Sequence, residues 1–189
     1  MGYHRAGFEV VGVDIKHQKH YPFEFHQADA MTYPLDGFDV IHASPPCQFY
    51  SYGTPDKSKH RGRLPEVREM LKRSGKPWVI ENVPGAPIDG TTRICGCQVG
   101  LPLIKRVRFF ELSFPFYSLM PPCSHPGPVI TVTGHGTTTG NRKTWGRNIR
   151  VSEMREAMGI DWMNRDELSQ AIPPAYTEWI GRQLMEHLK

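Results

Sequence analysis

The feature that most constrains the fold is an alternation of short apolar segments with a helical segment. Three segments are short, rich in β-branched residues and bounded by Gly, Pro or Asp, which is typical of buried strands: FEVVGVD (8–14), FDVIHAS (38–44) and PWVIENV (77–83). Between the last two, Leu64, Val67 and Leu71 fall on one helical face, and Gly75 is placed to end that helix. This β-α-β order predicts a parallel sheet with helices packed on its faces.

The rest of the chain predicts a small lobe followed by more helices. Residues 112–150 contain several prolines and glycines and one expected strand, PVITVT (128–133). Helical patterning returns in VSEMREAMG (151–159) and near the C-terminus, where Tyr176, Ile180, Leu184 and Leu188 form an apolar stripe. We therefore expect three parts: an α/β core (1–111), a small loop-rich lobe (112–150), and C-terminal helices that complete the core (151–189).

Composition limits the choice of class. With 189 residues and 39% hydrophobic content, the chain can bury one sizeable core. A net charge of +4 permits nucleic acid as a partner without demanding it. No apolar run approaches membrane-spanning length, and the N-terminus lacks the hydrophobic stretch of a secretory signal. We therefore expect no membrane partner, a cytoplasmic location, and reduced cysteines.

One cysteine has an unusual setting. In HASPPCQFYS (42–51), Cys47 follows two prolines at the end of an expected strand, and those prolines remove amide donors that a sheet ladder needs. Cys47 is therefore expected in a rigid turn at a strand end, where open α/β sheets carry their functional residues. A free cysteine can also be a small packing residue, and its position alone does not separate the two interpretations.

Four motifs, in order along the chain, resemble those of the C5-cytosine-specific DNA methyltransferases. They are PPCQFYS (45–51), ENV (81–83), KRVRFF (105–110) and QAIPPAYTEWIG (170–181). The resemblance runs from about residue 8 to the C-terminus, and residues 112–150 stand where that family carries its target-recognition region. It implies a Rossmann-like S-adenosylmethionine-dependent methyltransferase fold and DNA (cytosine-5-)methyltransferase activity, in the cytoplasm of a bacterium or of a phage-infected host. Restriction, phage modification and regulation all remain open as biological roles.

The resemblance also implies catalytic roles. Cys47 would add as a thiolate to C6 of cytosine, which makes C5 nucleophilic toward a methyl donor. Glu81 would hydrogen-bond N3 and the exocyclic amine as a carboxylic acid with a raised pKa. Arg106 and Arg108, one residue apart on an expected strand, project to the same face. Arg108 is assigned to the base and Arg106 to a supporting role.

The S-adenosylmethionine site is expected at two other strand ends. Asp14 would bind the ribose hydroxyls and Asp29 the adenine amine, with Ile15 and Pro46 covering the adenine faces. An Asp after a strand is also a common turn residue. Gln170 is assigned to the cofactor site, where the family more often has Asn.

Double-stranded DNA is the expected partner, and RNA is a less favoured target. A base inside a duplex must be flipped out to reach Cys47, so a basic loop after the nucleophile is expected to close on DNA and the lobe to contact grooves or phosphates. The assigned substrate-binding residues are Gln48, Ser51, Lys57, Lys59, Arg61, Arg63, Arg142, Lys143 and Arg147. Trp145 is expected to be exposed in the lobe.

One departure from the family concerns the cofactor. Members of that family begin with a strand and a glycine-rich turn, which lies near the methionine part of the cofactor. In this sequence, the first segment, MGYHRAGFEV (1–10), resembles only the helix that follows that turn. Loss of this central strand should expose neighbouring strands and weaken cofactor binding. Three interpretations follow: a shortened enzyme, a split or degenerate member that binds DNA or a partner chain supplying the strand, and a basic α/β binding module with a structural cysteine.

The other three cysteines form a further pattern. Cys95, Cys97, Cys123 and His125 make a Cys-x-Cys plus Cys-x-His set, which is chemically capable of tetrahedral zinc binding. Both spacings are unusually tight, and the expected reaction uses no metal. The sequence-based expectation is therefore a structural role without a metal.

Overall fold

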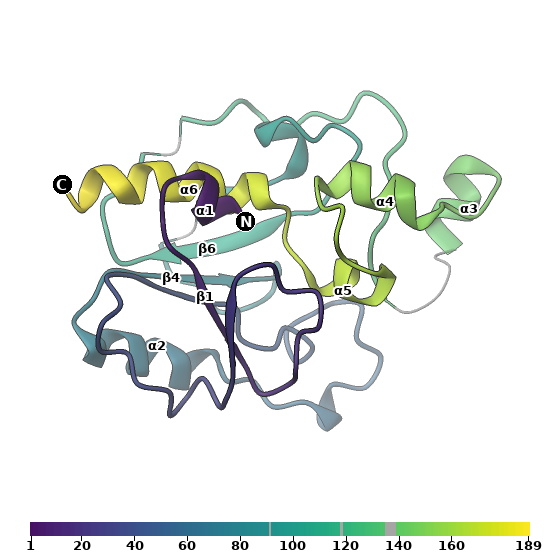
Figure 1. The fold of residues 1–189 in the computed structure, drawn as a ribbon. Helices are drawn as coiled ribbons and strands as arrows, with labels where there is room; N and C mark the ends of the chain where they lie inside the picture. Colours follow the sequence, from purple (N-terminus) through teal and green to yellow (C-terminus); the bar gives the residue numbers. More distant parts are fainter. Residues whose placement is uncertain (91, 118, 135–138) are drawn as a thin grey trace.

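The computed structural model describes residues 1–90, 92–117, 119–134 and 139–189, which form a mixed α/β fold (Figure 1). Its helices are α1 (Gly2–Arg5), α2 (Leu64–Ser74), α3 (Thr139–Trp145), α4 (Val151–Met158), α5 (Arg165–Gln170) and α6 (Pro174–His187), with 3-10 turns η1 (Lys57–Lys59) and η2 (Gly96–Val99). Its strands are β1 (Val11–Asp14), β2 (Glu24–Gln27), β3 (Ile41–Ala43), β4 (Trp78–Asn82), β5 (Thr92–Ile94) and β6 (Arg108–Leu112).

The strands form two separate sheets. β1 and β2 make a parallel pair, and the second sheet has the order β3-β4-β6-β5. β3 and β4 are parallel and joined through α2, as the β-α-β pattern predicted, whereas β6 runs antiparallel to β4 and β5. Within the described residues, β1 and β3 each pair along one edge only. Among the described residues, the outer strands β2 and β5 likewise pair along one edge, so the two sheets leave four strand edges unpaired.

The larger sheet lies between helices on both faces (Figure 1). Because side chains alternate along a strand, Ile80 points toward α2 and packs in its cluster, whereas Val79 belongs to the cluster on the α6 face. Leu64, Val67 and Leu71 of α2 are buried on the first face, as predicted from their spacing. α2 ends at Gly75, whose φ of 66° is the left-handed conformation that favours glycine.

A second core unites the lobe with part of the C-terminal region. Ile130 and Val132 of the lobe pack with Met154 and Met158 of α4 and with Leu168 of α5. Only α6 among the C-terminal helices contributes buried residues to the sheet cluster, through Tyr176, Ile180 and Leu184. Of the C-terminal helices expected to complete the core, α6 therefore packs on the sheet, whereas α4 and α5 pack with the lobe.

Three sequence-based expectations are wrong. PVITVT forms no strand, because only Ile130 makes a bridge, to Ile104. Leu188 follows the end of α6 and is 39% exposed, so it does not continue the buried stripe. Trp145 is half-buried against the lobe core and donates Nε1–H to the Val129 carbonyl at 3.1 Å, so it is not free for DNA.

Candidate active site

The topology brings three segments together at one edge of the larger sheet. Because β3 and β4 are parallel, the turn carrying Cys47 and the β4 residue Glu81 both lie at the carboxyl end of the sheet. Because β6 is antiparallel to β4, with Asn82 opposite Phe109, the first β6 residue, Arg108, lies beside the end of β4. The sheet therefore places three of the four predicted catalytic residues in one neighbourhood.

The Cys47 turn is held by backbone and side-chain contacts. The amides of Tyr50 and Ser51 both donate to the Cys47 carbonyl, at 3.0 and 2.9 Å. Asn82 donates Nδ2–H to the Pro45 carbonyl at 2.8 Å, which ties the end of β4 to the proline pair. Cys47 is half-buried in this turn. A rigid turn of this kind fixes the position of its thiol.

Glu81 and Arg108 form a buried ion pair. Arg108 Nε lies 2.9 Å from Glu81 Oε1, and their side chains are 13% and 8% exposed. Burial raises the pKa of Glu81, although Arg108, the Ser44 hydroxyl and Arg106 act in the opposite direction. Glu81 therefore holds a proton more readily than an ordinary carboxylate.

Arg106 is committed to carbonyl groups. Its Nη1 and Nη2 donate to the carbonyls of Val132 and Ser169 at 2.5 and 2.7 Å, and the residue is 6% exposed. Burial and Arg108 lower the pKa of Arg106 to about 9, opposed by Glu81, Tyr176 and Cys47. Arg106 precedes β6, which begins at Arg108, so the expectation that both arginines lie on one strand is wrong. The hydrogen bonds of Arg106 join this segment to the lobe and to α5, and its charge interacts with Cys47 and Glu81.

The Ser44 side chain hydrogen-bonds Glu81, and His42 in turn contacts Ser44; the sequence singled out neither residue. His42 Nδ1 lies 2.8 Å from the Tyr3 hydroxyl, and its Nε2 lies 3.0 Å from the Ser44 hydroxyl. Burial lowers the pKa of His42 to about 4, so the ring is neutral near pH 7. A chain of polar contacts therefore runs from α1 through β3 to Glu81. Tyr3 is 39 residues from His42, and no local sequence signal links them.

The expected adenosine-binding residues lie at the end of the smaller sheet. The Asp14 carboxylate accepts from Lys16 N at 2.8 Å and Gln18 Nε2 at 3.1 Å, and Asp29 Oδ1 accepts from Met31 N at 2.9 Å. Both acids thus order turns. The two turns are joined, because Ala28 N donates to the Asp14 carbonyl at 3.0 Å.

The other expected cofactor residues are accessible. Ile15, next to Asp14, is 67% exposed. Pro46 and Gln170 are also exposed, and Gln170 Nε2 donates to the Ser169 hydroxyl at 3.3 Å. An exposed apolar side chain beside a strand-end carboxylate is suited to adenosine, so the residues present fit that half of the cofactor.

The basic residues assigned to DNA form two groups. In the loop after Cys47, Lys59 pairs with Asp56 at 3.2 Å, Arg61 pairs with Glu66, and Lys57 Nζ lies 5.9 Å from the Tyr52 ring centroid. Arg63 is half-buried and precedes α2. Gln48 and Ser51, the polar candidates beside Cys47, are half-buried.

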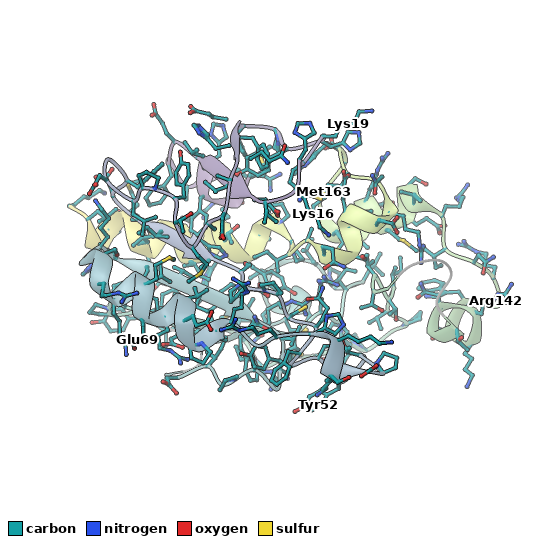
Figure 2. All side chains as sticks on the ribbon, turned by 90° about the horizontal axis from the view of Figure 1, so that it is seen from below. Lys16, Lys19, Tyr52, Glu69, Arg142 and Met163 are labelled. Atoms are coloured by element: carbon teal, nitrogen blue, oxygen red, sulfur yellow. The ribbon has the colours of Figure 1, made fainter. Side chains whose placement is uncertain are left out.

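In the lobe, Arg147 pairs with Glu153 at 2.6 Å and Arg142 donates Nε–H to Asn148 at 3.0 Å. The acid comes from α4, outside the basic segment, and was therefore missed in the sequence. Lys143 is exposed. Figure 2 shows Arg142 at the far end of the lobe and Tyr52 in the separate loop ahead of η1.

Two surface pockets lie along α6, and neither is lined by an expected catalytic or cofactor residue. Among the described residues, no helix has the length and apolar character needed to cross a membrane. In comparisons with known proteins, no protein-family model matched the chain and no curated protein matched it significantly.

Proposed function

We propose that the chain carries the catalytic centre of a C5-cytosine DNA methyltransferase, with Cys47 as the nucleophile and S-adenosylmethionine as the methyl donor. The observation that carries this proposal is the neighbourhood of Cys47, Glu81 and Arg108 at the carboxyl end of one sheet, together with the raised pKa of Glu81. These residue types are the ones that addition to a cytosine ring requires. The ordered motifs of the sequence support the same reaction.

In the proposed reaction, the Cys47 thiolate forms a bond to C6 of a flipped cytosine. The electrons of the C5–C6 double bond move toward C5 and the ring, and Glu81 delivers its proton to N3 to neutralise the developing charge. S-Adenosylmethionine supplies the methyl group to C5. The N3 proton returns to Glu81 as the methyl group is transferred. Loss of the C5 proton to water then restores the C5–C6 double bond and expels Cys47 as a thiolate.

Arg108 and Arg106 have separate proposed roles. When Glu81 is protonated, its attraction for Arg108 falls, and the Arg108 guanidinium becomes available to the base carbonyl. Arg106 is a positioning residue, because its guanidinium donates to carbonyls of the lobe and α5. Asn82 is likewise proposed to position the Cys47 turn through Pro45.

The cofactor would be held only in part by the described residues. Asp14 and Asp29 would bind ribose and adenine, with Ile15 against the ring. The unpaired edges of β1 and β3 are where the family's first strand would be inserted, and its glycine turn would approach the methionine end. We propose that this strand comes from additional sequence or from a partner chain.

The separation of the strands into two sheets also favours a second function, which is binding without catalysis. A chain without the central strand would bind DNA through its basic loop and lobe, or bind a strand-donating partner, without independent catalysis. Transfer of labelled methyl groups separates the two. Duplex DNA and RNA pools of random sequence are incubated with isotopically labelled S-adenosylmethionine, and 5-methylcytosine is measured by mass spectrometry after digestion.

Methylated cytosine in DNA that disappears with Cys47→Ser supports the enzyme. DNA binding without any transfer, also after a family-like strand is supplied, would support the non-catalytic alternative. Transfer to RNA alone would correct the proposed substrate.

A further inference from the structure

Four potential metal ligands converge beside β5, away from the proposed catalytic residues in sequence. They are Cys95, Cys97, Cys123 and His125, and their ligand atoms all lie within 4.8 Å of one another. We propose that these residues bind one zinc ion through three thiolates and one imidazole. The sequence-based expectation was a structural role without metal, because both spacings are tight. The fold now shows how these spacings bring four ligands to one point.

The separations suit a tetrahedral ion. Cys97 Sγ lies 3.4 Å from Cys123 Sγ, and Cys95 Sγ lies 3.2 Å from His125 Nε2. Zinc–sulfur bonds of about 2.3 Å at tetrahedral angles place two sulfurs about 3.8 Å apart, and sulfur and nitrogen ligands slightly closer. Both observed pairs therefore need only a small outward shift to surround an ion.

The Cys-x-Cys spacing works because the chain turns between its two cysteines. Cys95 is extended, with ψ 153°, and η2 begins at Gly96. A Cβ on Gly96 would lie 2.5 Å from the Ile104 carbonyl oxygen, so only glycine allows this close passage. Leu101 N also donates to the Gly96 carbonyl at 2.8 Å. The close packing at Gly96 and this hydrogen bond hold the turn that directs Cys97 back toward Cys95.

Hydrogen bonds around the four metal-ligand candidates fix the tautomer of His125 and hold the backbone at Cys95. His125 Nδ1 lies 3.3 Å from the Pro102 carbonyl, which can only accept, so Nδ1 carries the proton and Nε2 presents its lone pair toward Cys95. A second hydrogen bond of this kind is typical of metal-binding histidines. Gln98 joins the two arms, because its Oε1 accepts from Cys95 N at 2.9 Å and its Nε2 donates to the Pro121 carbonyl at 2.8 Å.

The ion would connect the segment that leads from β6 into the lobe with the end of β5. Cys95 directly follows β5, whereas Cys123 and His125 lie in the irregular segment between β6 and the lobe core. Three sulfurs and one nitrogen favour zinc over hard cations such as magnesium or calcium. The competing chemistry for the same atoms is a Cys97–Cys123 disulfide, which would leave Cys95 and His125 unlinked.

The test is metal analysis of the whole chain purified with a non-thiol reductant. We expect one equivalent of zinc per chain, and after exchange into cobalt(II) the visible absorption of tetrahedral cobalt with a thiolate-to-metal charge-transfer band. Removal of the metal with a chelator should lower the melting temperature, and zinc should restore it. No bound zinc, no tetrahedral cobalt spectrum, or a Cys97–Cys123 disulfide in the reduced preparation would overturn the proposal.

Matched variants locate the ion. Cys97→Ser and His125→Ala should each lose most of the bound metal or bind it at least about 100-fold more weakly, as expected for loss of one ligand. Cys47→Ser and His60→Gln, which alter a cysteine and a histidine outside the cluster, should keep the full equivalent. If a ligand variant does not fold, the cobalt spectrum of the unchanged chain still decides the question. Full metal content in both ligand variants would contradict the site.

Discussion

Glu81 is a buried acid next to Arg108, and burial and the arginine act on the pKa of Glu81 in opposite directions. Arg108 at 2.9 Å favours the carboxylate, whereas burial favours the neutral acid and has the larger effect. The balance can shift when a base enters, because N3 of cytosine then competes for the proton. A buried acid with a raised pKa is thus suited to protonate a ring nitrogen near neutral pH.

Glu81→Gln should therefore lower the rate of methyl transfer by about 100-fold to 10,000-fold, the usual contribution of a general acid. The amide keeps the shape of the side chain but cannot deliver a proton. DNA affinity, measured by fluorescence anisotropy, should change much less. Glu69→Gln, on the exposed face of α2, is the matched control. A Glu81→Gln chain with unchanged transfer rate would remove Glu81 from the mechanism.

His42 gives the fold a dependence on pH. Its pKa is about 4 in the folded chain against 6.5 as the ordinary value, so the unfolded chain binds the proton first. The stability that neutral His42 allows is complete above pH 6.5 and is lost as the pH falls toward 4. The loss is at most about 3.5 kcal/mol, since one pKa unit corresponds to about 1.4 kcal/mol, and less where residue 42 keeps some exposure.

The measurement is urea unfolding between pH 7.5 and pH 4 for the unchanged chain and for His42→Gln, whose amide does not titrate. The carboxylates titrate in both chains, so their effect cancels in the difference. We expect the unchanged chain to lose more free energy of unfolding over this range. Parallel pH profiles for the two chains would show that His42 is not held neutral by the fold.

The candidate nucleophile and acid were predictable from sequence because each belongs to a short motif at a strand end. The neighbouring residues that contact Glu81 directly or through one another were not predictable from the sequence. His42 and Ser44 shortly precede Cys47 in the sequence, but their role depends on contacts with Tyr3 and Glu81, which only the fold brings near. The metal cluster was discounted for a similar reason, since the turn at Gly96 cannot be read from spacing alone.

At the scale of elements, β1 and β3 each leave one edge unpaired within the described residues, and the proposed additional strand would pair there. Unpaired edges expose backbone donors and acceptors that favour pairing with another strand. A strand placed parallel to β1 would carry its glycine turn toward the Asp14 end of that strand.

A family-like strand and glycine turn added before residue 1 should therefore strengthen S-adenosylmethionine binding by at least about 100-fold. The reason is that two hydrogen bonds to charged groups contribute roughly 1.5 to 3 kcal/mol each. Calorimetry of the 189-residue chain and the extended chain measures the difference. An extension whose turn glycines are alanines is the control. Equal micromolar affinity in the unextended chain would show that the strand is not needed.

Elements with strong local patterns were predicted well, and those fixed by distant partners were not. α2 ends at Gly75 as predicted, and α6 buries three of the four residues of its predicted apolar stripe. PVITVT has high β propensity, yet Ile130 and Val132 are used in the lobe core, and burial there overrides the local preference. The short strand β2 carries little apolar alternation and is recognised only through its pairing with β1.

At the scale of the whole molecule, hydrogen bonds connect the lobe to the segment that precedes Arg108 at the sheet edge. Arg106 joins the beginning of β6 to Val132 of the lobe and Ser169 of α5, and the Tyr176 hydroxyl donates to the Arg106 carbonyl at 2.5 Å. DNA that contacts the lobe would therefore act on a segment directly attached to Glu81 and Arg108. This arrangement is consistent with one molecule that reads DNA with the lobe and reacts at the sheet edge.

The most direct test of this account is a covalent adduct between the chain and cytosine. Random-sequence duplexes in which 5-fluorocytosine replaces cytosine are incubated with saturating S-adenosylmethionine and either the 189-residue chain or the strand-extended chain. Fluorine at C5 blocks the final elimination, so the enzyme should remain attached to DNA in denaturant. We expect peptide mass spectrometry to place the adduct on Cys47 and Cys47→Ser to abolish it. An adduct on Cys95, Cys97 or Cys123, or none with either chain, would contradict the assignment.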